Sequence, residues 1–251
     1  MKFVRVSFLL LVFVWGCTLF KNSILDELHP LEMTKVRSGT FLMGDIFYEE
    51  NDDSTPVHEV ELADFKIGTY PVTYEQYDAF AKATDRELPK DDGRGRGNRA
   101  VVFVDWYDAR EFCHAYGYDL PTEQQWEYAA RSGGKQQLFS GTNNPDELSD
   151  FARYNNNSGP FSYWVGSKKP NDLGIYDMSG NVAEWIGEWY SFYKMDVDSV
   201  EYYPVEERAM RVIRGGSFTH PKSILRNYYR VGVLADTRSY NIGFRCVKNL
   251  E

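Results

Sequence analysis

The sequence predicts one domain of the α+β class with little regular secondary structure, and three observations support this. The 251 residues are 43% hydrophobic and 16% aromatic, which is enough apolar material for one sizeable core, and no second zone of composition follows. The clearest helix start signals occur in the first half of the chain. From Leu138 to Arg245 the chain is rich in Gly, Asn, Ser, Tyr and Trp, so long helices are not expected there.

The first residues have the pattern of a secretory signal peptide. Lys2 and Arg5 form a short basic region, and residues 6–15 are almost wholly apolar. A run of about ten residues is too short for a bilayer-spanning helix, which needs roughly 20. We therefore expect residues 1–16 to be a signal peptide and the protein to be exported.

Cys17 directly follows a glycine at the end of the apolar run. This arrangement resembles the lipobox of bacterial lipoproteins, in which the cysteine becomes the lipidated first residue. We expect residues 17–33 to be a lipidated tether that holds a domain of residues 34–251 at the cell surface, on the outer membrane of a bacterium. The alternative is ordinary cleavage and a free secreted protein.

The charge balance argues against a general nucleic-acid binder. The formal charge is −9 and becomes −11 when the two positive charges of Lys2 and Arg5 are removed with the signal peptide. Such a surface repels polyphosphate. We expect no nucleic-acid partner, contact with the membrane only through the lipid, and a monomer.

Apart from Cys17, the chain has two cysteines, Cys113 and Cys246. Two cysteines in an exported chain usually pair, because the compartment is oxidising. A bridge between them would close a loop of more than a hundred residues, which contributes about 4–5 kcal/mol in the chain-entropy model. The alternative is two buried free thiols.

Strand patterns precede the first predicted helix. Residues 35–43 and 57–67 alternate enough for strands. Thr73 with Gln76 three residues later forms a capping-box signature and predicts a helix over 74–84. The loop 90–99 (KDDGRGRGNR) has no phosphate-binding glycine motif after a strand, so we expect a solvated, flexible loop.

Two further helices and two short strands follow. Asp105 can cap a helix over 106–116, and Thr122 repeats the capping-box pattern before a third helix. Beyond these, the patterns favour only short strands at 211–214 and 243–247. We expect three tryptophans to be core residues: Trp126, Trp185 and Trp189.

Seven motifs occur in order along nearly the whole chain after the tether. They are residues 36–44 (VRSGTFLMG), 65–73 (FKIGTYPVT), 104–109 (VDWYDA), 120–131 (LPTEQQWEYAAR), 174–185 (GIYDMSGNVAEW), 214–217 (RGGS) and 243–246 (GFRC). Together they resemble the formylglycine-generating-enzyme (sulfatase-modifying factor) family. The resemblance implies a C-type-lectin-like fold with low regular secondary structure, and a bridge between the positions that match Cys113 and Cys246.

The same resemblance argues against the family's enzymatic activity. The family oxidises a substrate cysteine with two cysteines that hold copper, and the matching positions here are His220 and Leu225. Cu(I) prefers thiolates, and thiol redox chemistry needs one. The four histidines form no HxH or HExxH pair, and no GxSxG elbow occurs. We expect no copper and no catalysis.

The segment 177–184 (DMSGNVAE) is a candidate calcium site. Family members bind calcium with the side chains that match Asp177 and Glu184 and with the backbone carbonyls that match Gly180 and Val182. Calcium takes six to eight oxygens, and two carboxylates beside a turn suit that demand. The alternative is a structural turn in which Asp177 and Asn181 accept hydrogen bonds from backbone N–H groups.

The segment 214–245 alternates framework residues with clusters of no regular period. The framework comprises 214–217, Arg226, Arg230, Arg238 and 243–245. This alternation resembles the variable region of diversity-generating retroelement proteins, and in particular the Treponema variable proteins. The resemblance implies that the clusters contact a ligand: Thr219, His220, Pro221, Ser223, Ile224, Val231, Gly232, Val233, Leu234, Ser239 and Tyr240.

These patterns favour a surface lipoprotein that binds an extracellular protein or glycan through its C-terminal segment. A rigid scaffold with side chains projecting from irregular backbone resembles a paratope. Two alternatives remain: an exported enzyme of the same superfamily with altered chemistry, and a structural partner of an envelope complex with one fixed contact.

Overall fold

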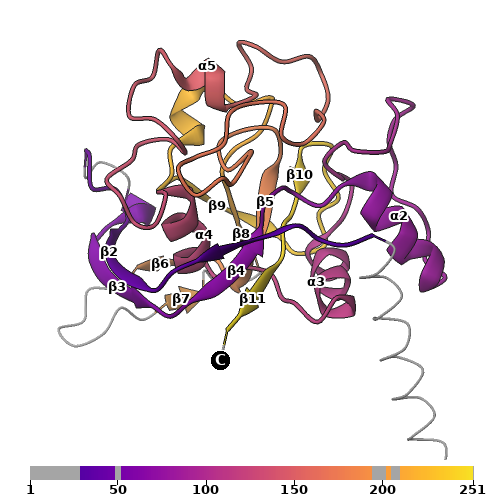
Figure 1. Ribbon diagram of the computed structural model, residues 1–251, viewed down its shortest axis with the longest axis horizontal. Helices are drawn as coiled ribbons and strands as arrows, with labels where there is room; N and C mark the ends of the chain where they lie inside the picture. Colours follow the sequence, from indigo (N-terminus) through magenta and orange to yellow (C-terminus); the bar gives the residue numbers. More distant parts are fainter. Residues whose placement is uncertain (1–28, 49–51, 194–201, 205–209, 251) are drawn as a thin grey trace, which may run out of the picture.

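The computed structural model describes residues 29–48, 52–193, 202–204 and 210–250. The predicted signal peptide and the lipidation site Cys17 lie outside this part. Within the described residues, no helix is long and apolar enough to cross a membrane. Short strands run through the middle of the molecule, and long loops lie above them in the view of Figure 1.

The two ends of the domain share a three-stranded antiparallel sheet. β4 (Phe65–Gly68) lies between β1 (Met33–Val36) and β11 (Val247–Asn249). Beside it, β2 (Gly39–Met43) pairs with β3 (His58–Leu62). Because Met33 lies in this sheet, the end of the predicted tether belongs to the folded domain, which corrects that boundary.

A second, four-stranded sheet contains the strands of the segment 214–245. Its order is β10 (Ile242–Gly243), β5 (Ala183–Trp189), β8 (Met210–Arg214) and β9 (Arg230–Leu234), with β10 parallel to β5 and the other pairs antiparallel. Two short strands, β6 (Ser191–Tyr193) and β7 (Tyr202–Pro204), form a separate antiparallel pair.

Three helices begin where the capping signals predicted. They are α2 (Tyr74–Ala83), α3 (Trp106–Ala115) and α4 (Glu123–Ala130), and each starts with a complete capping box. The remaining helical segments are single turns: η1 (Asp52–Ser54), α5 (Leu148–Phe151) and η2 (Lys222–Leu225). The α+β class with an irregular second half is confirmed.

The strand predictions were less accurate than those for the helices. The stretches 35–43 and 57–67 each contain two strands instead of one, and 243–247 contains the ends of two different sheets. β5 was not predicted at all. Its first four residues are all buried, so it lacks the in–out alternation by which half-buried strands are found.

Two large apolar clusters form the core. Cys113 and Cys246 form a disulfide inside the first cluster, with a Cα–Cα distance of 5.5 Å, and so tie α3 to the end of the C-terminal segment. Trp126 and Trp185 are fully buried, as expected. Trp189 is not, because 43% of it is exposed. Its ring instead lies on the guanidinium of Arg211 at the surface.

Candidate ligand-binding site

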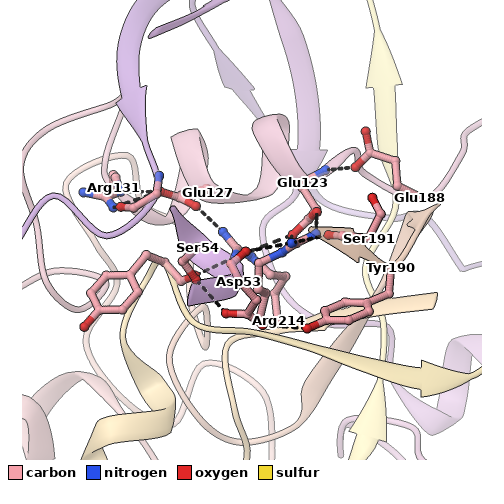
Figure 2. Close-up of polar contacts among 12 residues, drawn as sticks. Asp53, Ser54, Glu123, Glu127, Arg131, Glu188, Tyr190, Ser191 and Arg214 are labelled. Carbon is pink, nitrogen blue, oxygen red and sulfur yellow. Dashed lines mark hydrogen bonds and ion pairs between the residues drawn. The ribbon is translucent and has the colours of Figure 1, made fainter. Parts of the chain in front are cut away.

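A buried network of charges anchors the C-terminal segment to α4 (Figure 2). Arg230 on β9 makes a bidentate pair with Glu123, with Nε–Oε1 2.9 Å and Nη2–Oε2 2.5 Å. Arg214 on β8 donates to Glu127 and lies 3.6 Å from Glu123. All four side chains are completely buried. Two framework arginines of the segment are thus held by one helix.

The helical repeat explains why α4 can hold both arginines. Glu123 and Glu127 are four residues apart, so they lie on one face of the helix. Arg131, four residues further, donates to Glu127 and to the carbonyl of Gly44. A bidentate guanidinium fixes direction as well as distance. Removing one partner of such a pair typically costs 3–5 kcal/mol because a buried charge remains unpaired.

Glu188 and Asp53 lie at the margin of this network. A carboxylate oxygen of Glu188 accepts the backbone N–H of Glu123 at 2.5 Å. Burial, together with the negative charge of Glu123, raises the pKa of Glu188 to about 7. The carbonyl of Asp53 accepts from Arg230, and its side chain accepts from the Tyr190 hydroxyl at 2.8 Å.

The other framework arginines are paired as well. Arg245 makes a bidentate pair with Glu184 at 2.7 Å for both contacts, and it donates to the carbonyls of Gly68 and Tyr176. Arg238 contacts Asp105 and Asp108 at the start of α3 and is half exposed. The framework therefore attaches the segment to α3, to α4 and to β5.

The predicted ligand contacts differ from the framework in their exposure. None of the eleven residues is buried, whereas residues 214–217, Arg230 and 243–245 all are. Four of the eleven lie together around one pocket of about 250 Å³, here called the C-terminal pocket: His220, Ile224, Val231 and Val233. Seven further residues complete its lining: Ala183, Ile213, Arg214, Gly216, Tyr229, Asn241 and Ile242.

β9 presents its two faces to different surroundings. Val231 and Val233 line the C-terminal pocket. Side chains alternate along a strand, so Arg230, Gly232 and Leu234 belong to the opposite face. A Cβ on Gly232 would lie 2.6 Å from the ring of Tyr190. The structure therefore does not bring Gly232 and Leu234 into the pocket, unlike the prediction that grouped all four.

The remaining predicted contacts lie around the pocket. Pro221 and Ser223, at the start of η2, are exposed. Thr219 accepts a hydrogen bond from the side chain of Asn241 at 3.2 Å, and Ser239 donates to Asn241 at 2.6 Å. Tyr240 is 49% exposed and lines a different pocket.

His220 is held as a neutral imidazole in the C-terminal pocket. Its Nδ1 accepts the backbone N–H of Ser217 at 3.0 Å and lies 2.9 Å from the Ser217 hydroxyl. Burial lowers its pKa from the ordinary value of 6.5. With Nδ1 accepting, the proton of the neutral ring is on Nε2, which makes His220 a hydrogen-bond donor for a ligand.

This Ser–His contact lacks the features of a hydrolase site. Ser217 is 0% exposed, and its hydroxyl also contacts Thr219 and Asn241. Leu225 is fully buried. Among the described residues, no three His, Cys, Asp or Glu side chains form a group that could hold a metal.

The segment 177–184 makes the hydrogen bonds of a structural turn. Asp177 accepts the N–H of Gly166 at 2.8 Å, and Asn181 accepts that of Tyr163 at 2.8 Å. Glu184 is occupied by Arg245 and by the indole of Trp126 at 2.8 Å. The second carboxylate oxygen of Asp177 is buried with no partner, and burial raises its pKa to about 6. That free oxygen suits a cation, so calcium at Asp177 stays a prediction.

Several pocket residues were not predicted from the sequence. Tyr229, Ile213, Asn241 and Ala183 were not singled out as site residues. Ala183 comes from β5 and lines the same pocket as four predicted contact residues, although it is far from them in the chain. A strand prediction for β5 would have been the only signal for Ala183.

Comparison with known proteins agrees with this architecture. A family model described as "Sulfatase-modifying factor enzyme 1-like domain" matches residues 25–250. The chain belongs to this family. The formylglycine-generating enzyme of Streptomyces coelicolor is 30% identical over 86% of this chain and 89% of its own. The family also includes proteins named inactive, such as "Inactive C-alpha-formylglycine-generating enzyme 2" of Bos taurus, 28% identical over 86% of this chain.

Solved structures support the C-type-lectin-like fold of the formylglycine-generating-enzyme type. Treponema denticola variable protein 1 aligns with a TM-score of 0.71 and 26% identity, over 86% of this chain and 94% of its own. Some sulfatase-modifying-factor-like domains are parts of longer proteins. This chain is 31% identical to the serine/threonine-protein kinase pkn1 of Chlamydia pneumoniae, but it spans only 38% of that protein's length.

Proposed function

We propose that this protein is an exported, lipid-anchored surface protein that binds an extracellular protein or glycan through the segment 214–245. One observation carries the proposal: the eleven predicted contact residues all retain exposed surface, whereas most framework residues between them are buried. The buried arginines are paired with carboxylates outside the segment. Contact residues could therefore change without loss of the fold.

The C-terminal pocket suits recognition of a partly apolar group. Valine, isoleucine and tyrosine side chains line it, and His220 and Asn241 add polar groups. Small-molecule and side-chain pockets typically combine an apolar lining with a few polar groups that fix orientation. The likeness to a protein named as variable supports the same reading of the segment.

Sequencing the codons for residues 214–245 in many sister isolates tests the variability. We expect changes at the exposed contact positions, with Arg214, Arg230 and Arg245 constant. An unvarying segment would contradict diversification and leave a binder of one fixed partner.

Binding itself is tested with residues 17–251 on arrays of glycans and of secreted or cell-surface proteins. Val233→Asp puts a charge into the C-terminal pocket, and Leu234→Asp puts the same charge on the opposite face of β9. We expect the first variant to lose the captured ligand and the second to retain it. Equal loss in both folded variants, or equal retention, would contradict a ligand in this pocket.

An exported enzyme with altered chemistry is the second candidate, favoured by the Ser217–His220 contact. The burial of Ser217 argues against it, because a nucleophile must reach its substrate. We expect a fluorophosphonate probe to leave the native protein unlabelled, and labelling of Ser217 would favour the enzyme.

A further inference from the structure

A second pocket is lined in part by Tyr240, whose neighbour Asn241 lines the C-terminal pocket. Its volume is about 430 Å³, and we call it the arginine pocket. It is lined by Tyr74, Asp91, Asp92, Arg94, Arg99, Val102, Phe103, Pro160, Phe161, Ser162 and Tyr240. Tyr240 is one of the predicted ligand contacts, whereas its neighbour Asn241 lines the C-terminal pocket.

Arg99 is the unusual residue of this pocket. It is only 7% exposed, although the sequence predicted a solvated loop over 90–99, so that prediction is wrong for this residue. Its guanidinium donates to the carbonyl of Arg94 and, at 3.4 Å, to the hydroxyl of Ser162. Its Nε is buried without an acceptor. Within the described part of the chain, no carboxylate forms an ion pair with it.

This isolation contrasts with the buried framework arginines of the segment 214–245. Arg214, Arg230 and Arg245 each have a carboxylate partner within the protein. Burial lowers the pKa of Arg99, because removing the charged guanidinium from water is unfavourable. A buried guanidinium that forms no ion pair carries a desolvation cost, which an anion from outside the protein would offset. The Arg99 Nε–H without an acceptor therefore points to an anionic ligand group.

Aromatic rings form the walls around this cation. The ring of Phe161 lies 4.8 Å from the Arg99 guanidinium and 5.2 Å from that of Arg94. Tyr74 and Phe103 line the same space, and Tyr240 is half exposed beside it. Flat aromatic faces suit the flat face of a ring in a ligand.

Two carboxylates and the pocket's size narrow the ligand class. Asp91 and Asp92 also line the pocket, and ionised carboxylates only accept hydrogen bonds, as from hydroxyl groups. The volume is far larger than a simple anion needs and lies in the range of ring-sized ligands. A ligand with one negative charge, a flat ring face and several hydroxyl groups would match the cation, the aromatic rings and the carboxylates of this pocket.

We propose that the arginine pocket binds an acidic sugar unit, whose carboxylate or sulfate group pairs with Arg99 while its ring packs against Tyr240 and Phe161. This inference rests on the proposed ligand-binding function and names the chemistry of one ligand subsite. Adjacent residues connect the two pockets, because Tyr240 lines the arginine pocket and Asn241 lines the C-terminal pocket.

Titration calorimetry of residues 17–251 with glucuronate, glucose and inorganic sulfate tests this inference. We expect glucuronate to bind with a dissociation constant of about a millimolar or below, and glucose to bind at least roughly tenfold more weakly. A uronate-terminated oligosaccharide should bind more tightly still if the natural source is a glycan chain instead of a free sugar. No binding of glucuronate or of the oligosaccharide, or equal binding of sulfate, would overturn the acidic-sugar proposal.

Variants assign the binding to this pocket. Tyr240→Ala removes a half-exposed ring, and Arg99→Gln removes the cation; we expect roughly tenfold or greater weakening of glucuronate in each. Trp164→Ala is the matched control, because Trp164 is 68% exposed and does not line the pocket. Unchanged affinity in folded Tyr240→Ala would contradict the assignment even if Arg99→Gln fails to fold.

The Val233→Asp variant separates the two proposals. Glucuronate binding should survive this change, because Val233 lines only the C-terminal pocket. If glucuronate fails to bind while another ligand is lost on Val233→Asp, the acidic-sugar inference fails and the proposed function stands. If neither pocket variant affects any captured ligand, the proposed function fails.

Discussion

The framework and the contact residues of the segment 214–245 have opposite relations to the fold. Arg214, Arg230 and Arg245 are buried and reach out of the segment to carboxylates on α4 and β5. The predicted contact residues are all at least partly exposed. The difference teaches that the framework residues attach the segment to the fold, so the proposed contact residues between them are not needed for that attachment.

The largest loss of stability is expected when the disulfide that ties the end of the segment to α3 is removed. Replacing Cys113 and Cys246 by serine releases a bridge across 133 residues, so the free energy of unfolding should fall by about 4–5 kcal/mol in the chain-entropy model. Urea unfolding without reductant measures it. The wild-type protein with reductant is the control, and an unchanged midpoint would show that the bridge does not stabilise the fold.

Breaking one buried ion pair should have a similar or slightly smaller effect. Arg230→Met leaves Glu123 charged and buried, so we expect a loss of about 3–5 kcal/mol. The double variant with Glu123→Leu should recover part of that loss, because no unpaired charge remains. Thermal unfolding of the wild type, the single variant and the double variant measures the coupling between the two residues. An Arg230→Met variant as stable as the wild type would show that this ion pair does not stabilise the fold.

Glu188, at the margin of the buried charge network, should make the stability of the protein depend on pH. Because the pKa of Glu188 is raised to about 7 in the folded state, the native protein binds more protons than the unfolded chain between pH 4.5 and 7. The contribution of Glu188 to stability is therefore largest below pH 4.5 and falls as pH rises to 7, by roughly 2–3 kcal/mol. Glu188→Gln should lack this component in urea titrations at several pH values. Parallel pH profiles of variant and wild type would contradict it.

Calcium should produce a moderate shift if it binds at Asp177. A saturating ion at about a hundred times its dissociation constant adds about 2.7 kcal/mol, so a chelator should lower the melting temperature by several degrees. Asp177→Asn should abolish the response. A chelator without effect on the wild-type protein would leave the structural turn as the full explanation.

The smallest effect is expected on the contact face itself. Pro221→Ala, Ser223→Ala and Tyr240→Ala alter exposed side chains, so each should change the free energy of unfolding by no more than about 0.5 kcal/mol. Differential scanning calorimetry measures this. A loss above about 2 kcal/mol in any of them would end the distinction between framework and contact residues.

Local signals predicted the parts of this protein that depend on neighbours in the chain. The capping residues Thr73, Asp105 and Thr122 marked three helix starts, because a cap acts within four residues. The motif 214–217 and the irregular clusters after it marked the segment that lines the C-terminal pocket. No signal in the sequence marked β5. A strand that is buried over most of its length has no alternation of apolar and polar residues to detect.

The sequence by itself thus determined the fold class, the helix starts and the region of the candidate site. Only the tertiary structure decided which partners the arginines have, that Gly232 and Leu234 face away from the pocket, and that Arg99 is buried without a carboxylate. The physical reason is distance along the chain. Arg230 lies 107 residues from Glu123, and Arg99 lies 63 residues from Ser162. No local pattern of propensity or period encodes such pairs, because their geometry exists only once the strands and helices have packed.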